Sequence, residues 1–150
     1  MLTALLHNVT VIAALAAYFA AQLIKLITVM IRERRFDFKF LVRLGGMPSS
    51  HSATAAACAM SVGLRSGFDS AVFAVAFGIL VLVMIDAQSV RRAAGSQARL
   101  LNRLSEDFYR KDGASLEKLA ESLGHSGTEV LVGAMLGLVV AWLTHQVFPA

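Results

Sequence analysis

The sequence holds 150 residues, enough for one domain, of which 57% are hydrophobic and 16% are charged. A mean hydropathy of +0.65 excludes an ordinary soluble domain and indicates membrane-spanning helices. The formal charge is +4, and the single cysteine, Cys58, excludes an internal disulfide and a cysteine-based metal site.

Four apolar segments predict the helices of the fold. Residues 9–31 are long enough to cross a bilayer, and no Lys or Arg precedes them, so we interpret them as a retained helix rather than a signal peptide. Residues 50–64 are rich in alanine and short for a span, which favours a tilted helix or one packed inside others. A turn at 65–70 leads to a third segment, 71–90, and the fourth covers 128–148. The sequence therefore predicts an all-α integral membrane bundle, one domain over residues 1–150, with about four transmembrane helices.

A polar stretch, residues 91–127, separates the last two segments. Within it Leu101, Leu104 and Phe108 fall on one helical face, which is typical of a cytoplasmic amphipathic helix lying on the membrane or on the protein. Basic residues cluster after the first and third apolar segments. By the positive-inside rule both basic loops are cytoplasmic, and four spans then place both termini outside the inner (plasma) membrane. Because the basic residues flank spans, a soluble nucleic-acid-binding protein is disfavoured.

Several polar residues interrupt the apolar segments. Tyr18, Gln22, Lys25 and Arg32 are spaced so that they share one helical face. A lysine within a span usually faces the bundle interior, a cavity or a partner, so Lys25 is a phosphate or substrate contact, a structural ion-pair partner, or a side chain that reaches out to the lipid headgroups. Asp86 lies near the cytoplasmic end of the third segment. It would orient an arginine or histidine, bind a metal, or pair with Lys25, Arg91 or Arg92.

The stretch "GGMPSSHSA", residues 45–53, opens the second apolar segment. Ser49 or Ser50 can cap a helix whose first turn holds His51. Helix N-termini favour anions, and Gly45 and Gly46 allow the backbone to approach a ligand closely. The stretch is therefore either a phosphate cradle beside an imidazole or a capped helix with an interfacial histidine.

The stretch "LGHSGTEVLVGAMLG", residues 123–137, opens the fourth segment with the same design. His125 and Glu129 are four residues apart, so on a helix the carboxylate could orient the imidazole. The alternative is a capping box, Ser126-x-x-Glu129. Two such helix starts on one side of a membrane suggest an anion site with two histidines. One histidine can attack phosphorus and the other can protonate the leaving oxygen, while arginines neutralise the phosphoryl oxygens.

Two further features complete the pattern. Gly133-x-x-x-Gly137 permits close helix packing, either within the monomer or in a homo-oligomer interface. His7 and His145 lie near the opposite ends of their helices, and we interpret both as interfacial bystanders.

Four motifs together resemble the divergent branch of the type 2 phosphatidic-acid phosphatase superfamily, which also includes vanadium-dependent haloperoxidases. They are "GGMPSSHSA", "DAQSVRRAAGSQA", "LGHSGTEVLVGAMLG" and the pattern Leu101, Asn102, Leu104, Asp107, Phe108. The resemblance extends from Gln22 and Lys25 to Gly137, and so covers nearly the whole chain.

The resemblance implies roles for particular residues. The sequence "PSSH" ending at His51 is similar to the superfamily's Pro-Ser-Gly-His motif, with Ser50 replacing glycine, and implies that His51 is the general acid. His125-x3-Glu129 is similar to the end of the Ser-Arg-x5-His-x3-Asp motif, with glutamate replacing aspartate. There the histidine is the nucleophile that forms a phosphohistidine, and the carboxylate orients it.

Two departures from the superfamily pattern stand out. Leu119, six residues before His125, occupies the position where the pattern has arginine. Lys25-x6-Arg32 fits the spacing of a Lys-x6-Arg-Pro motif, but Glu33 follows in place of proline. Arg91, Arg92 or Arg43 would replace the missing arginine; alternatively, a chain that lost it has also lost the activity.

The resemblance thus implies an integral membrane phosphatase that hydrolyses a phosphomonoester or diphosphate of a lipid, of the phosphatidylglycerol phosphate or prenyl phosphate type, without metal or cofactor. His125 attacks, Glu129 orients it and His51 protonates the leaving group. The phosphate would be held by Arg91, Arg92, Lys25, Arg43, Ser49 and Ser50. Two rivals stay open: a non-enzymatic binder or transporter of anionic lipid or phosphate, and a metal-dependent enzyme using Asp86, Glu129 and the histidines.

Overall fold

A computed structural model describes residues 7–33, 46–109, 119 and 125–148 of the protein. The described residues form helices and no strands. The helices are α2 (Val9–Glu33), α3 (Ser50–Ser66), α4 (Ala71–Ile85), the short π-helix η2 (Asp86–Val90), α5 (Arg91–Tyr109) and α6 (Gly127–Val147). The prediction of an all-α fold is confirmed.

Among the described residues, three helical stretches are long and apolar enough to cross a membrane: Val9–Ile31, Ala71–Ser105 and Gly127–Val147. The protein is therefore a membrane helical bundle. Helix α3, with 17 residues, is not among the three. Its role as a fourth crossing stays a prediction.

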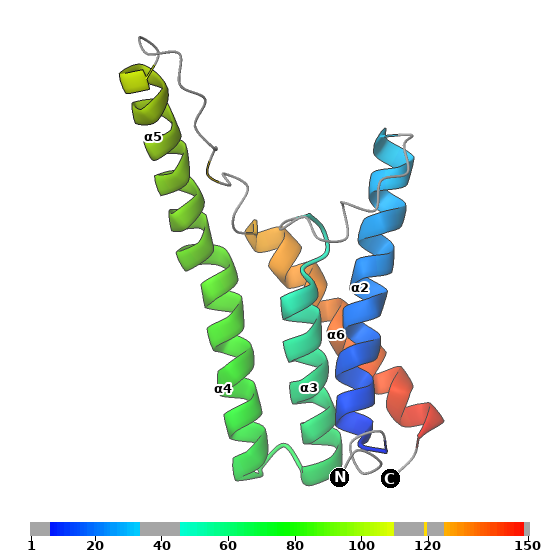
Figure 1. Ribbon diagram of the computed structural model, residues 1–150. Helices are drawn as coiled ribbons and strands as arrows, with labels where there is room; N and C mark the ends of the chain where they lie inside the picture. The colour runs from blue at the N-terminus through cyan, green and yellow to red at the C-terminus, as the bar shows by residue number, and fades with distance from the viewer. Residues whose placement is uncertain (1–6, 34–45, 110–118, 120–124, 149–150) are drawn as a thin grey trace.

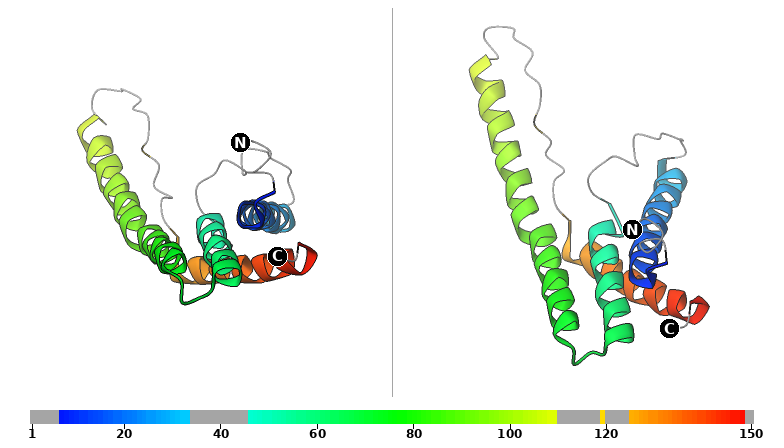
Figure 2. Two further views of the ribbon diagram at one scale, coloured as in Figure 1. Left: turned by 90° about the horizontal axis from the view of Figure 1, so that it is seen from below. Right: turned by 60° about the horizontal axis from the view of Figure 1, so that its bottom comes forward.

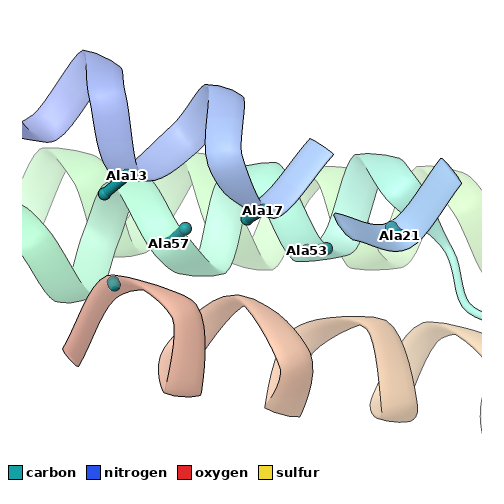
Figure 3. Close-up of a cluster of buried hydrophobic side chains, with 6 residues drawn as sticks. Ala13, Ala17, Ala21, Ala53 and Ala57 are labelled. Carbon is teal, nitrogen blue, oxygen red and sulfur yellow. The ribbon is translucent and has the colours of Figure 1, made fainter. Parts of the chain in front are cut away.

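Helix α3 lies at the centre of the bundle and packs against α2, α4 and α6 (Figures 1 and 2). Alanines form much of the contact surface. Figure 3 shows one buried cluster, which consists of Ala13, Ala17, Ala21, Ala53, Ala57 and Ala141. Small side chains let helix backbones approach closely, which is the usual way helices associate in a membrane. The expectation that the alanine-rich segment packs inside other helices is confirmed.

Gly133 and Gly137 of α6 face the backbone of α3. A Cβ at Gly133 would overlap the carbonyl oxygen of Ser49, and a Cβ at Gly137 would overlap that of Ala53. Both glycines are needed for this close crossing. Of the two uses left open for the motif, the structure shows packing within the monomer.

The helices alternate in direction, so the two ends of the bundle differ. Helix α2 begins and α6 ends at one end, whereas α3 begins, α4 ends and α6 begins at the other (Figure 1). We call this second end the site end. It brings together the helix starts that carry His51 and His125.

The helix predicted in the polar stretch is present as α5, and its placement on the membrane stays a prediction. The helix continues α4 through η2 as one long rod that extends past the rest of the bundle (Figures 1 and 2). Neither glycine nor proline occurs in η2, and a π-turn accommodates an extra residue without ending a helix. Leu101 and Leu104 are exposed along the rod.

Candidate functional site

The site end begins with the cap of α6. Ser126 Oγ accepts the N–H of Glu129 at 3.3 Å, and Glu129 Oε2 accepts the N–H of Ser126 at 2.9 Å. These two bonds are the two halves of a capping box, one of the two interpretations that the sequence left open for Glu129. The cap fixes the Glu129 carboxylate at the first turn of the helix.

The same carboxylate oxygen contacts the candidate nucleophile. Nδ1 of His125 lies 3.2 Å from Oε2 of Glu129, and the imidazole is only 8% exposed. When Nδ1–H donates to the carboxylate, the neutral ring carries its lone pair on Nε2. The capping box and the oriented histidine are therefore not alternatives, because one glutamate serves both.

The start of α3 is capped by Ser49. Its Oγ accepts the N–H of Ser52 at 3.4 Å and the Ser52 hydroxyl at 3.1 Å. His51 lies in the first turn, as predicted, and it is exposed, whereas Ser49 and Ser50 are buried. The predicted phosphate contacts of Ser49 and Ser50 stay predictions.

Two backbone hydrogen bonds join these helix starts to each other and to η2. The Ser49 N–H donates to the carbonyl oxygen of Glu129 at 3.0 Å, and the His125 N–H donates to that of Ala87 at 3.0 Å. Both histidine-bearing segments thus meet at one end of the bundle. A helix N-terminus favours an anion, and here two such termini are adjacent.

A pocket of about 280 Å³ opens beside His51. It is lined by His51, Leu82, Val83, Asp86 and Ala87. Asp86, the first residue of η2, therefore faces the same space as His51. Ala87, whose carbonyl oxygen accepts the His125 N–H, forms another wall of the pocket.

Lys25 faces the bundle interior, as its position in a span predicted. It is 9% exposed, and its charge is near enough to Glu129 for the two to attract. Its aliphatic chain runs beside Gly46: a Cβ on Gly46 would lie 3.7 Å from Cγ and Cδ of Lys25. Gly46 has φ of +94°, a backbone conformation that favours glycine. On the same helix Gln22 Nε2 donates to Tyr18 Oη at 3.0 Å.

Several predicted site residues lie outside the described part. Arg43 and Gly45 are among them, as is the side chain of Arg32. The backbones of Arg91 and Arg92 begin α5, next to η2, but their side chains are not described. The phosphate contacts predicted for these arginines stay predictions.

Leu119, which occupies the position of the superfamily arginine, is held elsewhere. Asn102 Nδ2 donates to the Leu119 carbonyl oxygen at 2.9 Å, and the Leu119 N–H donates to Asn102 Oδ1 at 3.0 Å. Asn102 stands about four helical turns beyond Ala87 on the α4–η2–α5 rod, a rise of roughly 20 Å. Proximity to His125 in sequence therefore does not place Leu119 beside the His125 imidazole.

The residues suggested for a metal do not gather around one point. Within the described ranges, no three His, Cys, Asp or Glu side chains lie close enough together to hold an ion. Asp86, Glu129, His51 and His125 are all described. The arrangement thus gives no support to the metal-dependent alternative.

A second polar cluster lies at the opposite end of the bundle, and the sequence did not predict it. His145 Nε2 lies 2.8 Å from Ser61 Oγ, and the Ser61 hydroxyl donates to Thr10 Oγ1 at 3.0 Å. His145 is therefore not an interfacial bystander, because it helps join α2, α3 and α6. The sequence did contain one signal, a hydroxyl side chain in each of two apolar helices: Thr10 in α2 and Ser61 in α3. Their spacing in the sequence does not show that both lie near His145.

Comparisons with known proteins agree with this arrangement. The profile of the divergent PAP2 family matches residues 6–140. The chain is 39% identical over 147 residues to the "uncharacterized membrane protein YuiD" of Bacillus subtilis (strain 168). The aligned region covers 91% of this chain and 93% of the relative. No solved structure matches it. The motif resemblance, the helical membrane bundle and the profile match agree: the chain belongs to the divergent PAP2 family.

Proposed function

We propose that this membrane protein is a lipid phosphatase that works through a phosphohistidine. The observation that carries the proposal is the pair of buried His125 and half-buried Glu129, 3.2 Å apart, at a helix N-terminus bonded to the start of the His51-bearing helix. A nucleophile, a group that orients it and an anion-favouring helix end are the parts that phosphoryl transfer to histidine needs.

The chemistry follows from these parts. Nε2 of His125 attacks phosphorus while the bond from phosphorus to the lipid oxygen breaks, and His51 gives its proton to that leaving oxygen. Glu129 stabilises the positive charge that develops on the His125 ring. Water then attacks phosphorus in the phosphohistidine, and His51 takes a proton from that water. The bond between phosphorus and Nε2 breaks, inorganic phosphate leaves, and His125 returns to its neutral form.

The phosphoryl oxygens need positive charge around them. The N-termini of α3 and α6 supply backbone N–H groups, and Lys25 supplies a buried ammonium near Glu129. Arg91, Arg92 and Arg43 are the candidates for the arginine that Leu119 does not provide. We place this site on the cytoplasmic side, with both termini outside.

The lipid part of the substrate would lie in the pocket beside His51. Three of its five lining residues, Leu82, Val83 and Ala87, are apolar, and Leu82 is 67% exposed on the outside of the bundle. A substrate already in the bilayer could therefore present its phosphate without leaving the membrane. A phosphatidylglycerol phosphate or a prenyl phosphate meets this description.

A second function is favoured by one observation. Leu119 pairs with Asn102, about four helical turns along the rod from Ala87, so the residue at the sequence position of the superfamily arginine lies away from the His125 backbone. A protein that binds or moves anionic lipid or phosphate would use the same helix N-termini without needing that arginine.

Phosphate release by purified, detergent-solubilised protein separates the two functions. The panel holds phosphatidylglycerol phosphate, phosphatidic acid and prenyl mono- and diphosphates, each with and without chelator, beside His125→Ala. Release that survives chelator and disappears in His125→Ala is expected for the phosphohistidine enzyme. Binding of these lipids by folded protein that releases no phosphate, and binding that persists in His125→Ala, would favour the non-enzymatic function.

A further inference from the structure

The side chain of Asn102 makes an unusual contact. Its amide pairs with both backbone groups of Leu119, donating from Nδ2 at 2.9 Å and accepting at Oδ1 at 3.0 Å. Two opposite residues of an antiparallel sheet exchange two hydrogen bonds in this way, and here a side-chain amide takes the place of one of them. Two bonds from one planar amide fix both the distance and the orientation of the partner.

The face of α5 that makes this contact is covered. Ala98 and Asn102, four residues apart and so on one helical face, are 7% and 8% exposed. Leu100 and Leu101, on other faces, are 60% and 53% exposed. The pairing with Leu119 therefore lies on the covered face of α5, while the Leu119 residue itself is 50% exposed.

The contact between Asn102 and Leu119 lies a few residues before His125 in the chain. Only residues 120–124 separate Leu119 from His125, and the His125 N–H is itself bonded to Ala87. Asn102 and Ala87 belong to the same α4–η2–α5 rod. The chain leading into the His125–Glu129 pair is thus attached to one rod at two points.

We infer that Asn102 is a positioning residue for His125: its two hydrogen bonds to Leu119 set where the chain enters the cap of α6. Asn102 touches neither phosphate nor lipid in this role. It acts through the backbone, so its loss displaces His125 while leaving the His125–Glu129 pair chemically intact.

Residue-resolved amide exchange in detergent micelles tests this inference without any assay of activity. In Asn102→Ala, the amides of Leu119 and His125 should both exchange faster by roughly tenfold or more. In Asn102→Asp the carboxylate still accepts the Leu119 N–H but donates nothing to its carbonyl, so a smaller rise is expected at both. Gln97→Ala removes an exposed amide from the same helix and should change neither amide. Amides of α3 report whether each variant is folded.

Two outcomes would overturn the inference. One is an unchanged Leu119 amide in Asn102→Ala. The other is faster exchange at Leu119 with no change at His125, because the contact would then be local. A kinetic arm rests on the proposed function: kcat should fall roughly tenfold in Asn102→Ala with KM changed less than about twofold. If the parent protein shows no phosphatase activity, the proposed function is wrong. The amide-exchange measurement would still decide whether Asn102 positions His125.

Discussion

Oε2 of Glu129 is shared between two partners, Nδ1 of His125 at 3.2 Å and the N–H of Ser126 at 2.9 Å. One bond belongs to the helix cap and the other to the candidate nucleophile. The geometry therefore couples the start of α6 to the orientation of the imidazole. Because an uncharged glutamine can also complete the cap, a substitution at Glu129 can remove the charge beside His125 and leave the helix start in place.

Glu129→Gln should lower phosphate release without unfolding the helix start. Glutamine also completes a capping box, so thermal unfolding should change little. The negative charge that stabilises a protonated His125 ring is lost, and we expect phosphate release to fall roughly 10- to 100-fold. Ser126→Ala is the matched control, since it removes the cap and should cost about 1 kcal/mol of stability. Equal activity in Glu129→Gln and the parent would remove the carboxylate from the mechanism.

His51→Ala should show an effect that depends on the leaving group. A lipid alkoxide needs a proton as it leaves, whereas p-nitrophenolate does not. We expect phosphate release from a lipid phosphate to fall roughly 100-fold or more and release from p-nitrophenyl phosphate to fall far less. His125→Ala, which removes the nucleophile, should abolish both. Similar losses on the two substrates in His51→Ala would contradict a general-acid role.

Local sequence signals predicted the elements that carry the site. A helix start is indicated by a cap residue and by the apolar residues that follow it. The predicted starts of α3 and α6 are therefore close to the observed ones, and the capping box at Ser126 is present. The inward direction of Lys25 followed equally from the cost of a charge in a span. The helix starts and the cap depend on interactions within one segment, whereas the direction of Lys25 depends on the contrast between lipid and bundle interior.

Contacts between distant segments could not be predicted in this way. Ser61 meets His145 from 84 positions away, and Asn102 meets Leu119 from 17. Neither pair has a spacing that a helical or strand period would align. The continuous rod was missed for a different reason: the polar residues after Val90 indicated a change of environment, but nothing in the sequence there ends a helix.

Gly137→Ala should destabilise the bundle, because its Cβ would overlap the carbonyl oxygen of Ala53. Overpacking of this kind costs about 1–3 kcal/mol. Gly78→Ala on α4 is the matched control, since among the described residues no atom outside its own helix backbone lies within 4 Å of the added Cβ. There the gain in helix propensity should stabilise the protein by up to about 1 kcal/mol. Thermal unfolding in detergent compares the two. A loss no larger in Gly137→Ala than in Gly78→Ala would contradict the close crossing.

Ser61→Ala should weaken the end of the bundle opposite the site. The Ser61 hydroxyl bonds to both His145 and Thr10, so removing it deprives side chains on α6 and α2 of their shared partner on α3. We expect a loss of about 1–3 kcal/mol in stability, measured by thermal unfolding. Phosphate release at temperatures where the variant is folded should persist, because the cluster is remote from His51 and His125. Ser66→Ala, at an exposed position of the same helix, should stay within about 0.5 kcal/mol of the parent. If Ser61→Ala were as stable as Ser66→Ala, the three-helix connection would contribute nothing to the fold.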